Sequence, residues 1–354
     1  MKKFVSIIMF VLCVSVCVFS GCSKEFDLQK FSKNLSTYNM DITYFDDHKL
    51  EVCETLEYVN NTSVSLPNIK LHIYPKDFCE GRVNSSVVSS LNYDKAYYNG
   101  VSYASIDFSK ILVNSKECNY TFENEDENIL NILFDKNIAP NDKITIYFEY
   151  SITLPNINHR FGYGENTINV SNFYPIVSVY ENGDFDMDSY HYNGDPFYSD
   201  FANYNVSVTV PSVYTLVSSG VVDSVTDLGE TKTYNISAIA IRDFAFIMSD
   251  SFEVKSTTID GVTVSYYYYS NTFADECLET SVRALATFKD LFGDYPYSTL
   301  NVVEANFVHG GMEYPNLVYI SDSVVDKADY LNVIVAYADD VSAFFNVIPR
   351  KIYF

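Results

Sequence analysis

The chain has 354 residues, of which 47% are hydrophobic and 19% are charged. This balance is typical of folded globular proteins and excludes a chain that is disordered throughout, and the length allows two or three domains. The 46 acidic and 23 basic residues give a formal net charge of −23. Such a field repels phosphate backbones and argues against nucleic acid as a partner.

The first 22 residues have the pattern of an export signal. Lys2 and Lys3 precede an apolar run over 4–19, which is followed by Ser20, Gly21 and Cys22. The length and the flanks of the run predict a cleaved signal segment and not a permanent membrane span. The small pair before Cys22 resembles the lipobox of bacterial lipoproteins. That resemblance implies lipidation of Cys22 and a protein anchored by lipid at the bacterial cell surface, whereas an ordinary signal peptide or a membrane anchor with a chance cysteine is the alternative.

Residues 23–40 are polar and predict a tether, and residues 41–255 predict a large, mostly antiparallel β domain. Apolar residues alternate with polar ones in KITIYFEYSITL (143–154), YNVSVTV (204–210) and VTVSYYYYS (262–270). An alternation of period two is the pattern of a strand with one buried face. The residues predicted to share buried faces are Ile144, Ile146, Phe148, Tyr150 and Ile152, then Tyr204, Val206, Val208 and Val210, then Val262, Val264, Tyr266 and Tyr268.

Four cysteines remain after the signal segment: Cys53, Cys79, Cys118 and Cys277. Outside the cytoplasm they could form two disulfides in any of three pairings. Their wide spacing matches no disulfide framework and contains no Cys-x-x-Cys pair, so we assign them to neither metal binding nor catalysis.

Aspartates alternate at Asp184, Asp186 and Asp188, which is the opening rhythm of a calcium loop. Ser189 and Asp195 occupy the positions that such a loop reserves for glycine and a bidentate glutamate. The run therefore predicts an acidic loop and no calcium site.

The pattern changes after residue 255. In 271–293, apolar residues recur at steps of three or four and predict a helix with one apolar face. Its start could be capped by Asn271 or Thr272, and Gly293 supplies the stop. The predicted face consists of Leu278, Val282, Leu285, Phe288 and Phe292. A second helix is predicted over about 325–345, with a strand-like segment between the two, so residues 256–354 predict the opening of an α/β domain. The expected fold class is mainly β followed by α/β.

The strand-like segment contains NFVHGGMEYPNLVYIS (306–321). This stretch resembles the catalytic domain of M1 zinc aminopeptidases, a gluzincin family whose hallmark is a Gly-x-Met-Glu-Asn loop. Gly310, Gly311, Met312 and Glu313 fill that pattern, and Tyr314 takes the place of Asn. The variant Gly-Met-Glu-Tyr-Pro resembles the bacterial, membrane-tethered branch of the family. The resemblance extends over about 40–348 and implies a saddle-like N-terminal β domain followed by the beginning of a thermolysin-like domain.

The resemblance also implies roles for this motif. Glu313 would bind the free α-amine of a peptide, and Gly310, Gly311, Met312 and Tyr314 would surround it. A buried carboxylate is tolerated where it meets a cation, and glycine permits close approach of another backbone. The alternative is an edge strand with a turn and no binding role. The implied partners are peptides with a free N-terminus and, through Cys22, the membrane.

The sequence departs from the family at its zinc site. The family needs His-Glu-x-x-His on a helix, so that two imidazoles share one helix face. The chain's five histidines, at positions 48, 72, 159, 191 and 309, all precede the Gly-Gly-Met-Glu stretch. The family pattern fits VAYADDVSAFFNVI (335–348), where Tyr337, Ala338 and Val341 stand in place of His, Glu and His. We therefore predict no catalytic residue and no metal ligand in this chain as written, although zinc is the cofactor of the family.

The sequence as a whole predicts a membrane-anchored, M1 aminopeptidase-like protein. It keeps the amine-binding loop and lacks the zinc motif, so it is expected to be non-catalytic. Two alternatives remain. The chain could be a fragment or frameshifted form of an active zinc aminopeptidase, because it ends in PRKIYF where the family would continue, or it could be a surface peptide-binding lipoprotein module.

Overall fold

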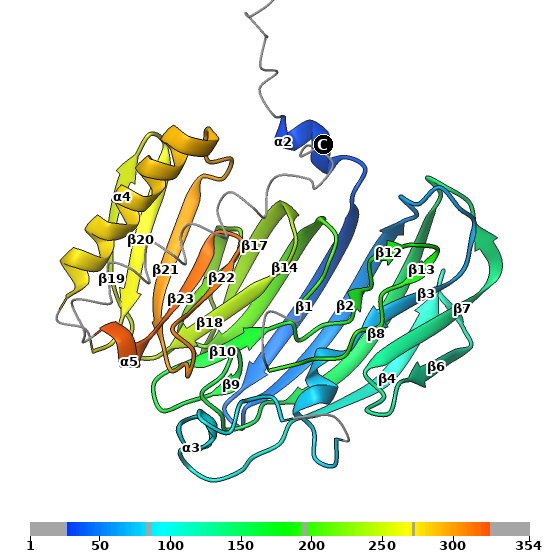
Figure 1. Ribbon diagram of the computed structural model, residues 1–354, viewed down its shortest axis with the longest axis horizontal. Coiled ribbons are helices and arrows are strands. Elements are labelled where there is room, and N and C mark those ends of the chain that lie inside the picture. Colours follow the sequence, from blue (N-terminus) through cyan, green and yellow to red (C-terminus); the bar gives the residue numbers. More distant parts are fainter. Residues whose placement is uncertain (1–26, 83–85, 193–196, 271–272, 326–354) are drawn as a thin grey trace, which may run out of the picture.

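The computed structural model describes residues 27–82, 86–192, 197–270 and 273–325 (Figure 1). Cys22 and the signal segment lie outside these ranges, as do nearly all of the second predicted helix and the stretch 335–348. Within the described ranges, no helix combines the length and apolar character that crossing a membrane requires.

The largest sheet has eight strands in the order β16-β17-β14-β1-β2-β8-β4-β5, in which only β1 and β14 run parallel. The strands are β1 (Ser36–Phe45), β2 (Lys49–Val59), β4 (Ser105–Val113), β5 (Lys116–Glu117), β8 (Lys143–Thr153), β14 (Ala202–Pro211), β16 (Val221–Asp227) and β17 (Thr231–Ile241). The alternating residues predicted to be buried in β8 and β14 are all buried. β1 begins at Ser36, so the ordered domain starts inside the predicted tether 23–40, which also contains α2 (Leu28–Ser32).

Two four-stranded sheets and one small hairpin complete the β domain. Their orders are β15-β18-β10-β9, β11-β3-β7-β6 and β12-β13. The elements are β3 (Leu66–His72), β6 (Tyr120–Glu123), β7 (Ile129–Ile138), β9 (Phe161–Tyr163), β10 (Ile168–Ser171), β11 (Ile176–Val177), β12 (Tyr180–Glu181), β13 (Asp184–Phe185), β15 (Thr215–Ser218) and β18 (Ala245–Ser249), with the 3-10 helix η1 (Tyr74–Phe78) and α3 (Tyr93–Ala96) between them. One continuous apolar core joins the large sheet to these smaller sheets.

The second domain is a five-stranded sheet in the order β19-β20-β21-β23-β22. Its elements are β19 (Glu253–Ile259), β20 (Val262–Tyr268), α4 (Ala274–Phe292), β21 (Thr299–Ala305), β22 (Gly311–Tyr314), β23 (Leu317–Ser321) and α5 (Asp322–Val325). β20 and β21 are parallel and are joined through α4, which makes a β-α-β crossover. The predicted order of a mainly β domain followed by α/β is confirmed. β19, the first strand of this sheet, begins at Glu253, three residues before the predicted boundary at 256.

The buried face of α4 differs from the predicted one. Leu285 and Phe288 are buried as predicted, whereas Leu278 and Val282 are only partly buried and Phe292 is 43% exposed. The centre of the buried face is formed by Cys277, Ser281 and Ala284. Small side chains at the centre let the helix axis approach the sheet, and the larger ones fill the two margins. Asn271 and Thr272 lie outside the described residues, while Gly293 follows the last turn as predicted.

The five-stranded sheet is covered on both faces. α4 packs on one face. The other face packs against β15 and β18 of the first domain, in a cluster that includes Val217, Ile247, Tyr314 and Tyr319. The Tyr319 hydroxyl donates to the carbonyl of Phe246 at 3.0 Å. The two domains therefore share an apolar interface, and the Gly-Gly-Met-Glu strand lies in it.

Two other predictions concern single side chains. Cys53, Cys79, Cys118 and Cys277 form no disulfide among the described residues. In the acidic stretch, a carboxylate oxygen of Asp186 lies 3.7 Å from Nε2 of His72, and the nearby imidazole lowers the pKa of Asp186. At least one of the three alternating aspartates is therefore used in a contact within the fold.

Candidate functional site

β22 is the outermost strand of its sheet. It pairs antiparallel with β23, from Gly311 opposite Ile320 to Tyr314 opposite Leu317. In the part of the chain that the structure describes, no strand pairs with its other edge. β22 is therefore an outer strand of the described sheet.

Side chains along β22 alternate between the two faces of the sheet. Met312 and Tyr314 are buried in the domain interface, whereas Gly311 and Glu313 are half-buried. The Tyr314 hydroxyl donates to Oγ of Ser171 at 2.6 Å, and its ring packs edge-on at 5.1 Å from the ring of Tyr319. The Tyr314 side chain therefore joins the two domains and points away from the side chain of Glu313. The side chains of Met312 and Tyr314 thus lie on the face of the sheet opposite that of Glu313.

Glu313 lies on the same face of the sheet as α4, which packs over β19 and β20 on that face. Its cross-strand partner is Val318, which packs in the α4 cluster. Glu313 is only half-buried and Gly310 is exposed, so this end of the strand meets solvent. Of the predicted site residues, Gly310, Gly311 and Glu313 are brought together at an accessible edge.

Glu304 is a second carboxylate on this face, two strands away on β21. It is fully buried. Its Oε2 accepts from the backbone N–H of Tyr269 at 3.0 Å and of Ser270 at 3.2 Å, and its Oε1 accepts from the Ser270 hydroxyl at 2.6 Å. Three donors satisfy the buried charge and hold the chain at the end of β20. Glu304 is thus a structural residue of the site.

Asn306 connects the two domains next to the motif. Its Oδ1 accepts from the backbone N–H groups of Asn166 at 2.6 Å and Thr167 at 3.0 Å. Its Nδ2 lies 2.9 Å from the Tyr269 hydroxyl and donates to Oδ2 of Asp322 at 2.7 Å. One buried amide therefore holds a loop of the first domain, the end of β20 and the start of α5. This arrangement fixes the chain that leads into Gly310.

Two histidines lie behind the motif. The ring of His309, next to Gly310, is 5.4 Å from the ring of the fully buried His159. Burial lowers the pKa of His309 to about 4, helped by Arg160, and burial lowers the pKa of His159 well below its usual value. Both imidazoles are therefore neutral at pH 7 and add no positive charge beside Glu313.

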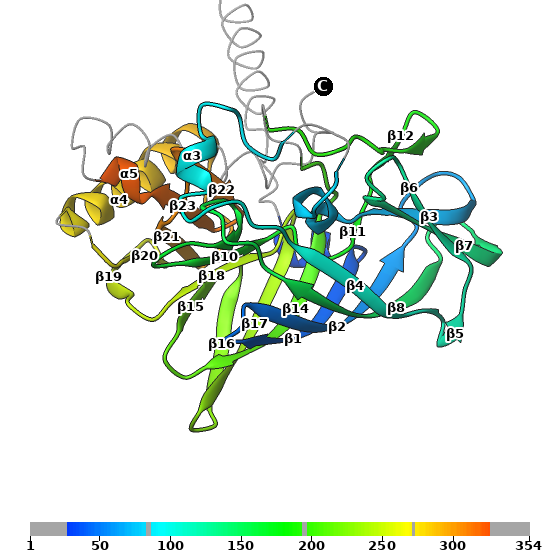
Figure 2. The ribbon, with the colours of Figure 1, turned by 90° about the horizontal axis from the view of Figure 1, so that it is seen from below.

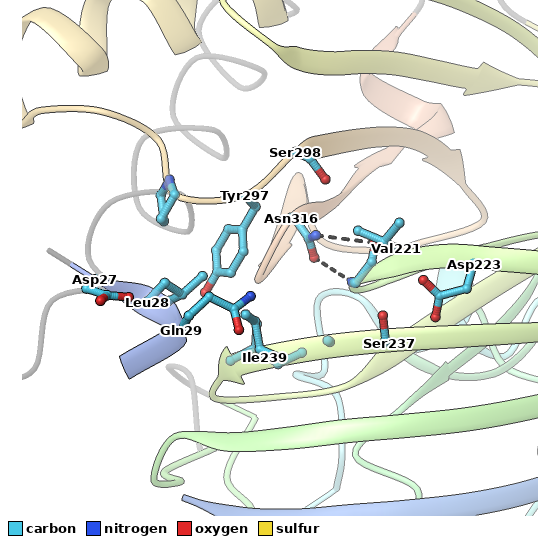
Figure 3. Close-up of a pocket in the computed structure, with 14 residues that line it drawn as sticks. Asp27, Leu28, Gln29, Val221, Asp223, Ser237, Ile239, Tyr297, Ser298 and Asn316 are labelled. Atoms are coloured by element: carbon cyan, nitrogen blue, oxygen red, sulfur yellow. Dashed lines mark hydrogen bonds between the residues drawn. The ribbon is translucent and has the colours of Figure 1, made fainter. Parts of the chain in front are cut away.

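A cavity of about 760 Å³ lies at the other end of the β22–β23 hairpin (Figure 3). α2, β16, β17 and residues 296–298 line it together with Asn316, whose Oδ1 accepts from the backbone N–H of Gly220 at 2.8 Å. None of the residues 310–314 lines this cavity. It is a separate feature from the predicted amine site.

The described residues do not fit a zinc ion. Among them, no three His, Cys, Asp or Glu side chains come together as potential ligands. The stretch 335–348 lies outside those residues, so the predicted replacement of the zinc ligands is a statement about the sequence. We derive no chemical step through a metal.

Sequence reasoning missed Glu304, Asn306 and the pairing of His159 with His309. A signal existed for Glu304, because it follows Leu300 and Val302 on the alternating apolar face of its strand. Asn166 and Thr167, which donate to Asn306, lie about 140 positions earlier in the chain. His159 lies 150 positions before His309, so no local pattern indicates these contacts.

Solved structures share this fold. An M1 zinc metallopeptidase from Deinococcus radiodurans matches with a TM-score of 0.57 and 14% sequence identity, over 86% of this chain and 63% of that chain. A mutant of the same enzyme matches with a TM-score of 0.58 and 13% identity over the same shares. Its complex with a Tyr-Ser-Ala substrate matches with a TM-score of 0.55 and 14% identity, over 85% of this chain. No protein-family model and no curated protein sequence matches the chain. The chain therefore has an M1 metallopeptidase-like fold and spans 63% of the length of these structures.

Proposed function

We propose that this protein binds the amino-terminal end of peptides along β22 and does not cleave them. In the proposal, Glu313 accepts the α-amine, and Gly310 and Gly311 let the peptide backbone approach the strand. The observation that carries it is the position of Glu313, half-buried on the outer strand β22 and three residues from the exposed Gly310.

The physical basis is the addition of a strand to a sheet edge. An extended peptide can exchange backbone hydrogen bonds with β22 in the way that recognition domains add a peptide strand. A carboxylate at the end of that strand selects a free ammonium group, because a charge-assisted hydrogen bond is about twice as strong as a neutral one. The formal net charge of −23 favours the approach of a cationic group.

Anchoring through Cys22 is part of the proposal. A lipid on this residue would hold the peptide-binding edge at the bacterial cell surface. Fractionation of cells that express Cys22→Ser tests it: the variant is expected in the soluble extracytoplasmic fraction, and full retention in the membrane fraction would contradict lipidation of this residue.

The proposed absence of cleavage is motivated by the residues from 1 to 354. All five histidines precede Gly310, and the sequence has no His-Glu-x-x-His. A fragment or frameshifted form of an active zinc aminopeptidase is the second candidate, because 335–348 fits the family pattern apart from its ligands. The DNA after codon 335 separates the two. A neighbouring frame that encodes His-Glu-x-x-His and a downstream Glu favours the second candidate.

Glu313→Gln tests the amine site. The substitution keeps the size of the side chain and removes its charge, so the affinity for Ala-Ala-Phe-Phe-Ala with a free N-terminus is expected to fall about 10- to 100-fold, the value of a hydrogen bond to a charged group. Isothermal titration calorimetry on the full chain measures this affinity. The N-acetylated peptide is expected to bind weakly to both proteins.

Glu279→Gln is the matched control, because Glu279 lies on the exposed side of α4. Equal affinity for the free and the acetylated peptide would contradict amine recognition. Release of the first residue from the peptide would contradict a non-cleaving protein.

A further inference from the structure

Residues 91–103, here called the tyrosine loop, expose an unusual number of large apolar side chains. Leu91 is 89% exposed, Val101 50%, Tyr103 46% and Tyr98 44%. The loop contains α3, on which Tyr93 is 38% exposed. Exposed apolar side chains gathered on one segment mark an interaction surface more often than scattered ones do.

Asn158 links the tyrosine loop to the Gly310 end of β22. Its backbone N–H donates to the carbonyl of Ala96 at 2.9 Å, and its Nδ2 donates to that of Lys95 at 3.2 Å. Its own carbonyl accepts from the N–H of Val308 at 3.2 Å. Val308 precedes Gly310 by two residues, so one residue separates α3 from the chain that leads into the motif. Figure 2 shows α3 on the side of the molecule where β22 and β23 lie.

A second set of contacts holds the base of the loop. The Tyr190 hydroxyl donates to the carbonyl of Val87 at 3.1 Å and lies 3.3 Å from Nε2 of His159. His159 in turn contacts the ring of His309. Within the loop, the rings of Tyr93 and Tyr97 lie 4.9 Å apart. Burial, then Tyr93 and Tyr103, raises the pKa of Tyr97 to about 12, which agrees with a compact group of rings.

The hairpin leaves one direction for a peptide held at Glu313. Beyond Tyr314, Asn316 bonds to the N–H of Gly220 and lies 3.3 Å from the hydroxyl of Thr299, so contacts with other strands occupy that end. Gly310 at the opposite end is exposed. An extended chain that starts at Glu313 and follows the accessible edge therefore runs toward Gly310 and the tyrosine loop.

We propose that the tyrosine loop binds apolar side chains of this same peptide, about three or four residues from its free N-terminus. The inference rests on the proposed function and assigns its substrate class: peptides that combine a free amino end with aromatic or aliphatic residues at these positions. At about 3.3 Å per residue, such positions lie about 7–10 Å along the strand from the first residue. Tyrosine side chains offer a rigid contact area with little conformational entropy to lose.

A membrane surface is the less fitting occupant. Figure 1 places α3 and α2 at opposite edges of the molecule. α2 begins the described part of the chain, just after the segment that leads to Cys22. A loop at the far edge points away from the surface to which the N-terminal end is proposed to be tied.

The test compares two peptides on the full chain by calorimetry: Ala-Ala-Phe-Phe-Ala and Ala-Ala-Ser-Ser-Ala, each free and N-acetylated. The Phe peptide is expected to bind about tenfold more tightly than the Ser peptide, the value of one to two aromatic contacts. Tyr98→Ser combined with Tyr103→Ser is expected to abolish that difference and to leave the Ser peptide unchanged. Tyr98→Phe with Tyr103→Phe keeps the rings and is expected to restore it.

Tyr120→Ser is the matched control, because Tyr120 is 42% exposed on β6 and outside the loop. If the double serine variant loses its thermal transition, Leu91→Ser and Val101→Ser replace it. If the wild type binds the Phe and the Ser peptide with equal affinity, and N-acetylation still weakens the binding of both, this inference is overturned and the proposed function stands. Failure of every peptide to bind overturns the proposed function as well. Flotation with anionic phospholipid vesicles that is lost in the double variant, while peptide affinity is unchanged, assigns the loop to a membrane and also overturns the inference.

Discussion

Glu54→Gln is expected to stabilise the protein at pH 7–9 but not at pH 4.5. The difference in free energy of unfolding between the variant and the wild type is expected to be about 3–5 kcal/mol more favourable to the variant at pH 7–9 than at pH 4.5. Glu54 is fully buried on β2, and among the described residues only the Tyr150 hydroxyl bonds to its carboxyl, donating to Oε2 at 2.9 Å. Burial raises the pKa of Glu54 to about 8 from an ordinary value of 4.5. Each unit of difference between the folded and unfolded pKa corresponds to about 1.4 kcal/mol.

The direction follows from proton binding. Between pH 4.5 and about 8 the folded chain holds a proton on Glu54 that the unfolded chain has released. Stability contributed by this group is therefore complete below pH 4.5 and falls as the pH rises through 8. Glutamine cannot ionise, so the variant lacks this loss. Asp77, whose pKa burial raises to about 6, acts in the same direction in both proteins and cancels in the comparison.

Urea unfolding at several pH values between 4.5 and 9 measures this difference. The amide introduced by Glu54→Gln can lower the free energy of unfolding by an amount that does not depend on pH. The decisive quantity is therefore how the difference in free energy of unfolding between the wild type and the variant changes with pH. Glu51→Gln removes a carboxylate from the exposed face of the same strand and is the control. Parallel stability curves for the wild type and Glu54→Gln would contradict the raised pKa.

Gly164→Ala is expected to lower the free energy of unfolding by about 3 kcal/mol, at the upper end of the usual cost of overpacking. A Cβ on Gly164 would lie 2.4 Å from Oδ1 of Asn158 and 2.5 Å from Cβ of Asn306. These two asparagines connect the first domain to the chain that enters β22. The junction has to separate by several tenths of an ångström to admit a methyl group, which lengthens the hydrogen bonds of Asn306.

Thermal unfolding measures the loss, and amide hydrogen exchange locates it. The N–H groups of Asn166 and Thr167, which donate to Asn306, are expected to exchange faster in the variant. Gly229→Ala is the control, because a Cβ at this position would meet no other atom. Its φ of +92° still disfavours alanine, so the substitution is expected to cost about 1 kcal/mol through backbone strain alone. Unchanged protection of Asn166 and Thr167 would show that Gly164 does not hold this junction.

The β domain could be predicted because its strands alternate regularly. Val206, Val208 and Val210 are buried in β14 as their spacing requires. The same alternation in β2 places Glu54 in phase with Val52 and Leu56, so the buried carboxyl could have been found from the sequence. Its partner could not, because Tyr150 lies 96 positions away in the chain.

Errors arose where local pattern and tertiary contact differ. The large apolar residues of α4 indicated one face, but the approach to β20 selected the small residues beside it. The motif by itself does not show on which face each of its side chains lies, and successive side chains on a strand point to opposite faces. Once Tyr314 donates to Ser171, Glu313 must lie on the other face.

By itself, the sequence determined the class of fold, the order of the two domains and the strand that carries Gly310, Gly311 and Glu313, because periodicity and glycine placement are local properties. Only the tertiary structure decided that β22 is an outer strand, that Tyr314 is an interface residue and that the tyrosine loop lies next to Gly310. These outcomes depend on contacts between residues far apart in the chain, such as those of Asn158 with Lys95, 63 positions away, and with Val308, 150 positions away. Burial of a shared core has to offset the entropy cost of closing these long loops, and no short stretch of sequence encodes that balance.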